Sequence, residues 1–283
     1  MATIIDGKFV AQTIRDHLKD QVALLIQKYH VTPHLAVILI GDNPASQSYV
    51  RGKEIACQKA GIQSTVVRKP STITEAELIE VIDSLNQDPS VHGILLQLPI
   101  PKHLDSDKII SLIRSDKDVD GFTMENVAKL TNGKGDLIPC TPLGVMRLLE
   151  YYQIPIAGKH AVVIGRSQIV GKPLASLLLK ENATVTICHS KTVDLKGLCR
   201  QADLLFAAIG VPNMITSEYV KPGAVVIDVG ISKVDGVITG DVHFDSVQAL
   251  ASYLTPVPGG VGPMTIACLL ENTLRCYQKL VGV

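Results

Sequence analysis

A glycine-bearing loop between two apolar segments is the feature that most constrains the fold of this chain. The apolar run at residues 161–164 precedes the loop at residues 165–173, and a second apolar segment at residues 174–179 follows it. This order predicts a buried strand, a tight loop and a helix. Free backbone N–H groups and the helix dipole attract anions at a helix N-terminus, and glycine permits close approach. The loop therefore predicts an α/β fold with a phosphate-binding turn.

The spacing within this loop matches neither of the two common phosphate motifs. A nucleoside-triphosphatase loop has four residues between its glycines and then Lys-Ser or Lys-Thr. Here five residues separate Gly165 from Gly171, and Lys172 is followed by Pro173. The dinucleotide pattern G-x-G-x-x-G has Ser167 in place of its second glycine. The loop favours a nucleotide cofactor, and a plain strand-to-helix turn is the alternative.

Strands alternate with helices on both sides of this loop, and the predicted fold class is α/β with two α/β domains. A long amphipathic helix opens the chain at residues 6–29, and Thr74 with Glu77 forms a capping-box pattern before another helix. Such alternation predicts parallel sheets with right-handed crossovers, the later one Rossmann-like. The apolar runs expected as strands are residues 34–40, 63–68, 91–98, 161–164, 184–188, 203–209 and 224–229.

The domain assignment follows from this pattern. Residues 1–139, completed by the last helix at 264–283, are assigned to one domain, and residues 140–263 to the Rossmann-like domain. Residues 116–142 are rich in polar residues and glycine without sustained periodicity, so we interpret them as the connection beside an interdomain active-site cleft. Residues 255–263 hold too many prolines and glycines to be predicted as helix or central strand.

Composition excludes several classes of protein. Among 283 residues, 46% are hydrophobic, and 27 basic side chains balance 27 acidic ones. We therefore expect a globular protein with no nucleic-acid partner. The N-terminus does not resemble a signal peptide and no apolar run is long enough for a bilayer, so a soluble, cytosolic protein with no membrane partner is expected. Six scattered cysteines without a C-x-x-C pair predict reduced thiols and no metal site.

Four polar residues are candidates for chemistry in the first domain. Tyr49 and Lys53 are four residues apart and share one face of a predicted helix that starts at the carboxyl edge of the sheet. Gln97 ends another strand at the same edge, and Asp120 could reach it from the connecting loop. Together they offer an amine, a phenol, an amide and a carboxylate. The alternative is that Tyr49 and Lys53 are ordinary surface residues.

The segment after the second strand of the later sheet indicates the choice of cofactor. An NAD-selective fold usually has an acidic side chain there for the ribose hydroxyls. This chain has Ser190 flanked by His189 and Lys191 instead. A carboxylate would repel a 2′-phosphate, whereas Ser190 can donate a hydrogen bond to it and Arg166 can offset its charge. The segment favours NADP, with solvated loop residues as the alternative.

Two further stretches each have two interpretations. The glycines at residues 258–263 could let a flat ligand lie against the main chain or could simply form a tight turn. Cys140 lies between prolines and invites interpretation as a nucleophile. No nearby base supports that role, so a packed cysteine is favoured.

Taken in order, these motifs resemble the bifunctional methylenetetrahydrofolate dehydrogenase/cyclohydrolase family over essentially the whole chain. The resemblance implies that NADP accepts a hydride from 5,10-methylenetetrahydrofolate and that water opens the resulting methenyl cation to 10-formyltetrahydrofolate. It also implies a homodimer paired through the cofactor domain. The stretches that carry it are residues 48–53, 97–99, 118–121, 139–142, 165–171 and 258–263.

The resemblance also implies roles for individual residues. Lys53 would be the central catalytic group, with its properties tuned by Gln97. Tyr49 would orient the folate, and Asp120 would anchor its pterin. The remaining implied contacts are Gly259, Gly260 and Thr265 with the folate, and Gly165, Arg166, Ser167, Ser190 and Ile231 with NADP.

Two other functions agree with only part of this pattern. An NADP-dependent dehydrogenase of another small substrate would share the cofactor domain, but it has no reason to carry Tyr49, Lys53 and residues 258–263 together. A nucleotide-sensing or scaffold protein would have no need to keep every candidate catalytic residue.

Overall fold

The computed structural model describes all 283 residues and divides them into two compact units. We name each unit after its main sheet. The six-stranded unit comprises Met1–Gln12, Leu130–Lys134 and Pro139–Cys268, and the three-stranded unit comprises Thr13–Lys129, Gly135–Ile138 and Leu269–Val283. Two long helices, α1 (Gly7–Tyr29) and α10 (Val261–Val281), have residues in both units. No helix has an apolar stretch sufficient to cross a membrane.

The sheet of the six-stranded unit is parallel throughout and has the order β1-β11-β8-β7-β5-β6. Its central strands are buried on both faces, as the continuous apolar runs predicted. The predicted α/β fold class is confirmed. The strands are β1 (Thr3–Ile4), β5 (His160–Ile164), β6 (Thr184–Cys188), β7 (Leu204–Ala207), β8 (Val225–Asp228) and β11 (Tyr253–Leu254).

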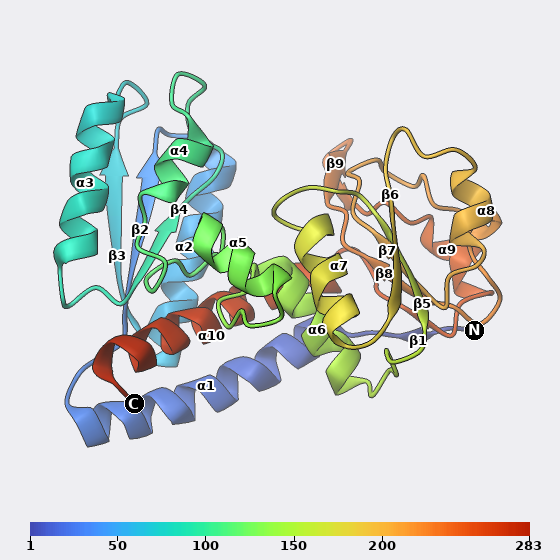
Figure 1. The fold of residues 1–283 in the computed structure, drawn as a ribbon, viewed down its shortest axis with the longest axis horizontal. Coiled ribbons are helices and arrows are strands. Elements are labelled where there is room, and N and C mark those ends of the chain that lie inside the picture. The colour runs from blue at the N-terminus through green and yellow to red at the C-terminus, as the bar shows by residue number, and fades with distance from the viewer. The chain divides into compact units, whose positions relative to one another are not determined.

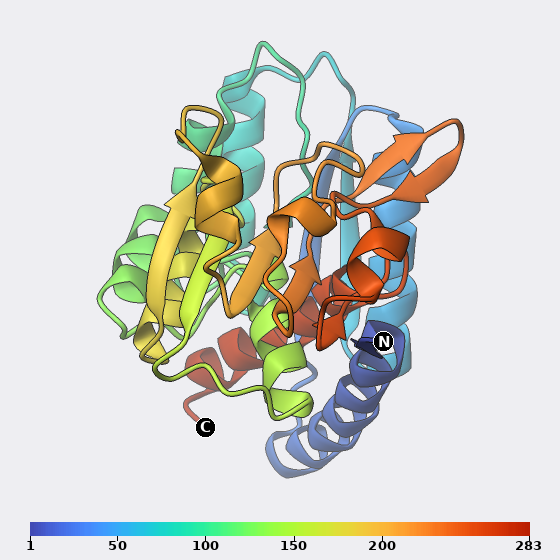
Figure 2. The ribbon, with the colours of Figure 1, turned by 90° about the vertical axis from the view of Figure 1, so that its right-hand side faces the viewer.

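Short helices connect these strands, and an antiparallel hairpin follows β8. The hairpin, β9 (Ser232–Val234) with β10 (Val237–Thr239), is the orange pair of strands at the upper right of Figure 2. The helices are α6 (Cys140–Tyr151), α7 (Gly171–Lys180), α8 (Leu195–Cys199) and α9 (Phe244–Gln248), with a 3-10 turn, η1 (Ser217–Tyr219).

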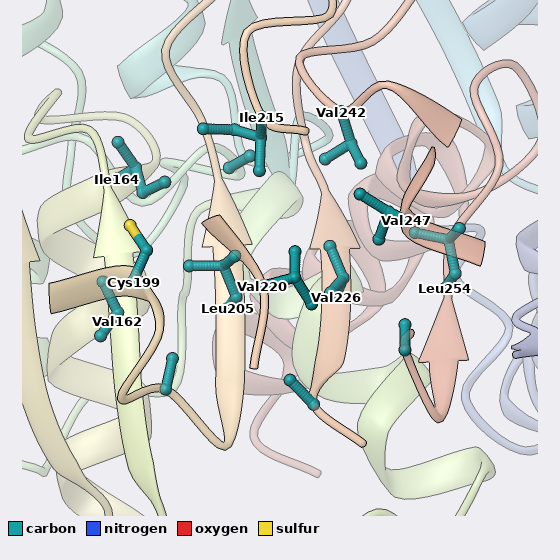
Figure 3. Close-up of a cluster of buried hydrophobic side chains, with 14 of the residues drawn as sticks. Val162, Ile164, Cys199, Leu205, Ile215, Val220, Val226, Val242, Val247 and Leu254 are labelled. Carbon is teal, nitrogen blue, oxygen red and sulfur yellow. The ribbon is translucent and has the colours of Figure 1, made fainter. Parts of the chain in front are cut away.

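One face of the sheet carries the core shown in Figure 3. Val162, Leu205 and Val226 come from β5, β7 and β8 and are fully buried, as is Leu254 from β11. Side chains of the connections, such as Val247 of α9, complete the cluster. Burying one such aliphatic side chain contributes about 1.5–3 kcal/mol, so this face holds the strand ends in place.

The three-stranded unit has a parallel sheet in the order β3-β2-β4 (Figure 1). Side chains of α3 and α4 pack on the face of β2 that carries Ala36 and Ile38. The elements are β2 (His34–Ile40), β3 (Gln63–Lys69), β4 (Gly93–Leu96), α2 (Pro44–Ala60), α3 (Glu75–Gln87), α4 (Ser106–Ser111) and α5 (Met124–Thr131).

Local capping sets the ends of the helices. Asn43 caps α2 by accepting hydrogen bonds from the next backbone N–H groups, and Gly61 ends that helix in a left-handed conformation with φ of 75°. The capping box of Thr74 and Glu77 is present at the start of α3, as the sequence predicted.

Two expectations about the irregular segments were wrong. Residues 116–142 contain α5 and the start of α6, and residues 261–263 belong to α10 rather than to a loop. The buried positions of α5 are Asn126 and Leu130, and because the first of them is polar the apolar periodicity of this short helix is weak. Pro263 lies in the first helical turn, where a missing N–H costs no intrahelical hydrogen bond.

The compact units also depart from the predicted domains at the ends of the chain. The sequence assigned residues 1–139 to one domain, but residues 1–12 belong to the six-stranded unit. The reason is β1, which pairs with β11 in parallel. Likewise, α10 begins in the six-stranded unit and ends in the three-stranded unit, so the last helix is shared by both units.

Two histidines are buried at the amino ends of β2 and β4. Nδ1 of His92 accepts a hydrogen bond of 3.1 Å from the backbone N–H of His34, and the His92 ring packs edge-on against Tyr277. Burial lowers the pKa of His92 to about 4, and the positive charges of His34 and Lys117 act in the same direction. His92 is therefore neutral in the folded protein, and its protonation would remove the acceptor that His34 uses.

This arrangement predicts a loss of stability in mild acid. The folded pKa of His92 lies below the unfolded value of about 6.5, so the unfolded chain binds more protons between those values. The contribution of His92 to the free energy of unfolding should be complete above about pH 7.5. Between roughly pH 7.5 and pH 5, the free energy of unfolding should fall by about 2 kcal/mol. In urea denaturation, a His92→Asn variant, which keeps an acceptor but does not titrate, should show a smaller decline. Equal declines would contradict the prediction.

Candidate functional site

Lys53 and Gln97 are brought together in the three-stranded unit. Gln97 follows β4, where its backbone N–H donates to the Ile38 carbonyl of β2 at 2.9 Å. The amide Nε2 of Gln97 donates to the Leu98 carbonyl at 2.7 Å, which leaves Oε1 to accept a 2.9 Å hydrogen bond from Lys53 Nζ. Gln97 is buried and Lys53 half-buried. The structure thus holds one amine in a defined direction at the carboxyl edge of the sheet.

Tyr49 lies one helical turn before Lys53 on α2. Its side chain is 60% exposed, so the ring is open to solvent and can stack against a flat partner. The helix that carries both residues starts at the carboxyl end of β2, as the sequence predicted. The side chains of this turn are therefore directed from a rigid element rather than from a loop.

Asp120 lies on a loop that is hydrogen-bonded to strand β4 of the three-stranded sheet. The Lys117 carbonyl accepts a 2.7 Å hydrogen bond from the N–H of Ile94 in β4, and Asp118 forms a bridge with Ile94. The buried carboxylate of Asp118 accepts hydrogen bonds from Thr123 N–H and Asn126 Nδ2. Asp120 follows two residues later and is half-buried. Its backbone position is thus determined by its neighbours.

Two supports of this loop come from distant parts of the chain. Nδ2 of Asn272, on α10, donates to the carbonyls of Val119 and Ile138 at 2.8 Å each. Gly121 has φ of 66°, and a Cβ there would lie 2.7 Å from the Leu137 carbonyl oxygen. Sequence reasoning missed Asn272, because a lone polar residue in an apolar helix gives no local sign of its partner.

In the six-stranded unit, the glycines of the 165–173 loop are required by packing. A Cβ on Gly165 would overlap the carbonyl of Ala208, and a Cβ on Gly171 would overlap the carbonyl of Gly165. Gly165 also has φ of 124°, a conformation that favours glycine. The loop therefore fits closely between β5, α7 and the segment that follows β7.

Ser167, which replaces the second glycine of the dinucleotide pattern, holds the loop with hydrogen bonds of its own. Its hydroxyl accepts hydrogen bonds from the N–H groups of Val170 and Gly171 at 3.2 and 3.3 Å, and its carbonyl accepts one from Lys172 N–H. These bonds hold Ser167 against the start of α7, whose N-cap residue is Val170. The side chains of Ser167 and Arg166 are both exposed, so the guanidinium is available to an anion at this turn.

Ser190 lies in a turn directly after β6. The turn is held by hydrogen bonds from His189 N–H to Thr192 Oγ1 and from Lys191 N–H to His189 Nδ1. Ser190 itself is exposed. Since residues 189–192 include no acid, the turn presents hydroxyl, imidazole and ammonium groups without a carboxylate.

Ile231 and Thr265 lie around the start of α10. Ile231 follows β8 and is 56% exposed, and a Cβ on Gly262 would be 3.6 Å from its Cδ1. The hydroxyl of Thr265 donates to the Gly262 carbonyl at 2.8 Å. The structure thus gathers these two predicted residues at one helix end.

Gly259 and Gly260 form a tight turn with the N-terminal segment. A Cβ on Gly7 would overlap the Gly260 carbonyl, and Lys8 N–H donates to the Gly259 carbonyl at 3.1 Å. A Cβ on Gly260 would lie 2.6 Å from the Pro256 carbonyl oxygen, and Gly259 has φ of 113°, so packing and backbone conformation account for these glycines. Their contact with folate stays a prediction. Cys140 is buried in the first turn of α6, in the packed position that the sequence favoured.

Comparisons with known proteins cover nearly the whole chain. The catalytic-domain model of tetrahydrofolate dehydrogenase/cyclohydrolase matches residues 5–120, and the NAD(P)-binding-domain model of that family matches residues 139–281. The bifunctional protein FolD of Exiguobacterium sibiricum is 56% identical over 278 residues, which cover 98% of this chain and 100% of that protein. FolD of Moorella thermoacetica is 53% identical over 279 residues, or 98% of this chain and 99% of that protein.

Solved structures give the same result. The bifunctional enzyme FolD of Campylobacter jejuni is 50% identical, with a TM-score of 0.97 and 99% of each chain covered. The Trypanosoma brucei FolD, a methylenetetrahydrofolate dehydrogenase-cyclohydrolase complexed with NADP cofactor and an inhibitor, is 40% identical with a TM-score of 0.94. The match covers 100% of this chain and 99% of that one.

Proposed function

Because this chain belongs to the tetrahydrofolate dehydrogenase/cyclohydrolase family, we propose that it carries out both reactions of that name. It oxidises 5,10-methylenetetrahydrofolate with NADP, and it hydrolyses the methenyl product to 10-formyltetrahydrofolate. The observation that carries the proposal is the hydrogen bond between Lys53 Nζ and Gln97 Oε1 at the sheet edge. This hydrogen bond orients the Lys53 amine, and the hydrolytic step requires an oriented amine of this kind.

The hydrolytic step needs a group that handles protons. Water must lose a proton as it adds to the methenyl carbon, and a positioned amine contributes to such transfers. Gln97 Oε1 accepts one N–H of Lys53, which leaves the other positions on Nζ for water or substrate. Tyr49 supplies an exposed ring for the flat pterin, and Asp120 supplies a carboxylate that can accept hydrogen bonds from it.

The oxidative step depends on positioning. NADP, when bound, supplies the carbon that accepts the hydride, and the protein contributes orientation rather than acid or base. The donor set fits the cofactor: Arg166 and Ser190 are exposed, and no carboxylate accompanies Ser190 in its turn. Gly165, Ser167 and Ile231 complete the proposed contacts. Gly259, Gly260 and Thr265 are proposed to flank the folate.

The functional domains follow the same proposal. We assign the folate chemistry to residues 1–139 with 264–283 and cofactor binding to residues 140–263. The boundaries of the two family models, at 120 and 139, support a division near this point.

Replacing Lys53 should separate the two activities. In Lys53→Met the amine is lost while the length of the side chain is kept, so cyclohydrolase turnover should fall by about 100-fold or more. Dehydrogenase activity should be retained in part, because hydride transfer needs no lysine. Both rates can be followed by absorbance of the methenyl compound and NADPH.

Lys59→Met is the matched control for this experiment. Lys59 lies on the same helix, is exposed and is not part of the proposed site, so both activities should stay near the wild-type level. Full cyclohydrolase turnover in Lys53→Met would refute the role of Lys53.

Cofactor selectivity gives a second prediction. The Michaelis constant for NADP should be lower than that for NAD in the wild-type enzyme. Ser190→Asp places a carboxylate beside the 2′-phosphate and should raise the constant for NADP by about ten-fold, with a smaller effect on NAD. Ser190→Asn, which is similar in size but uncharged, should change it less. A wild-type preference for NAD would show that this turn had been misinterpreted.

We further propose a homodimer formed through the six-stranded unit. Strand β6 is the last strand of the sheet and leaves one edge unpaired (Figure 2). Ile187 on this strand is 41% exposed, and Leu179 of α7 is 65% exposed. An apolar, unpaired strand edge supports pairing with a second copy.

Sedimentation equilibrium tests this assembly. The wild-type protein should sediment at twice its chain mass of 30.4 kDa, and Ile187→Lys should shift the equilibrium towards the monomer. Leu24→Lys, at another exposed apolar position on α1, should leave the mass unchanged. A monomeric wild-type protein would contradict the proposal.

A further inference from the structure

Two carboxyl groups are buried side by side at the carboxyl edge of the six-stranded sheet. Asp228 is the last residue of β8 and is 3% exposed, and Asp241 follows the β9–β10 hairpin and is 0% exposed. Neither belongs to the proposed contacts with cofactor or substrate. Burying a carboxylate is costly unless hydrogen bonds compensate it, so their contacts indicate what they do.

Asp228 joins the two ends of the hairpin insertion. Its Oδ1 accepts hydrogen bonds from the N–H groups of Gly230 and Asp241, both at 3.0 Å, and its Oδ2 accepts one from Val242 N–H at 2.9 Å. Its own N–H donates to Thr255 Oγ1 at 2.7 Å. One carboxyl group thus fixes the chain where it leaves β8 and where it returns after the hairpin.

Asp241 extends this connection to a third segment. Its Oδ2 accepts hydrogen bonds from Ile209 N–H at 2.7 Å and Gly210 N–H at 3.1 Å, just after β7. Its Oδ1 has no hydrogen-bond partner. The backbone of Asp241 is held as well, since its carbonyl accepts from Ile215 N–H at 2.9 Å. Ile215 and Val242, whose N–H groups take part in these hydrogen bonds, belong to the core cluster drawn in Figure 3.

Glycines allow the two acids to approach the backbone so closely. A Cβ on Gly230 would overlap the carboxyl group of Asp241, and a Cβ on Gly240 would overlap that of Asp228. Burial raises the pKa of Asp228 to about 7 and the charge of Asp241 acts in the same direction, against the N–H groups that lower it. The hydrogen bonds from three backbone segments therefore offset the cost of burying two neighbouring acids.

Two of these segments lead to proposed cofactor contacts. Ile231 directly follows Gly230. Ala208, whose carbonyl packs against Gly165, directly precedes Ile209 and donates its N–H to the Ile164 carbonyl of β5 at 2.8 Å. Loss of the Asp241 contacts would release the segment on which the glycine loop rests, while the three-stranded unit would keep its own contacts.

We propose that Asp228 and Asp241 are positioning residues that set the backbone of the dinucleotide site, acting through residues 208–210 and 229–231. This inference rests on the proposed function, since it assumes that Gly165 and Ile231 bind NADP. It predicts that breaking the pair impairs NADP binding and leaves the chemistry at Lys53 intact.

The test compares two replacements of Asp241 in the full-length enzyme. Asp241→Ala removes the acceptor for Ile209 and Gly210 and leaves two buried donors unpaired, so the Michaelis constant for NADP should rise by about ten-fold or more. Asp241→Asn can keep an amide oxygen towards these two N–H groups and should restore most of the affinity. Cyclohydrolase activity, assayed on methenyltetrahydrofolate without NADP, should stay within about two-fold of wild type in both variants. The reason is that Lys53 and its partner Gln97 lie in the three-stranded unit, which keeps its own contacts.

Asp203→Asn is the matched control. Asp203 lies before β7 at the opposite end of the strand, where it pairs with Lys221 at 2.7 Å, so its loss should leave the constant for NADP unchanged. An unchanged constant for NADP in Asp241→Ala, or an equal loss in Asp241→Asn, would overturn the positioning role. A parallel loss of both activities in both variants would indicate a merely structural role and would also overturn it. Absence of NADPH formation by the wild-type enzyme would instead refute the proposed function.

Discussion

Parallel pairing of strands is the constraint on which both halves of this protein depend. It places the carboxyl ends of neighbouring strands along one edge, where the backbone must turn and where helices begin. Gln97 after β4 and Ser190 after β6 lie at such ends. Strand pairing therefore brings the site residues to one edge of each sheet, and local hydrogen bonds then fix their positions.

Those hydrogen bonds come largely from buried polar side chains that make no proposed contact with a ligand. Asp118 holds the loop of Asp120, and Asp228 with Asp241 holds the turn that leads to Ile231. Each buried group offsets its desolvation by accepting hydrogen bonds from backbone N–H groups. Hydrophobic packing fixes the strands, whereas these bonds fix the irregular backbone between them.

The sequence predicted what depends on regular patterns and missed what depends on long-range partners. Apolar runs located the main strands, and the Thr74 capping pattern located the start of α3, because both signals are local. Helix α5 was missed, since one of its two buried positions, Asn126, is polar and only Leu130 is apolar. The Lys53–Gln97 pair was foreseen as a cluster, but its hydrogen bond spans 44 positions of the chain and has no local signal. The pairing of β1 with β11 was missed for the same reason.

That pairing also limits how this fold can be divided. The N-terminal strand hydrogen-bonds with the strand at residues 253–254, and Gly7 packs on the carbonyl of Gly260. A gene fragment that begins at the second family domain would encode the glycine loop but would lack the outermost strand and the partner of that turn. Transfer of the cofactor-binding half into another protein would therefore have to include the first twelve residues from the opposite end of the gene. The cofactor-binding half of this protein is therefore not one continuous stretch of sequence.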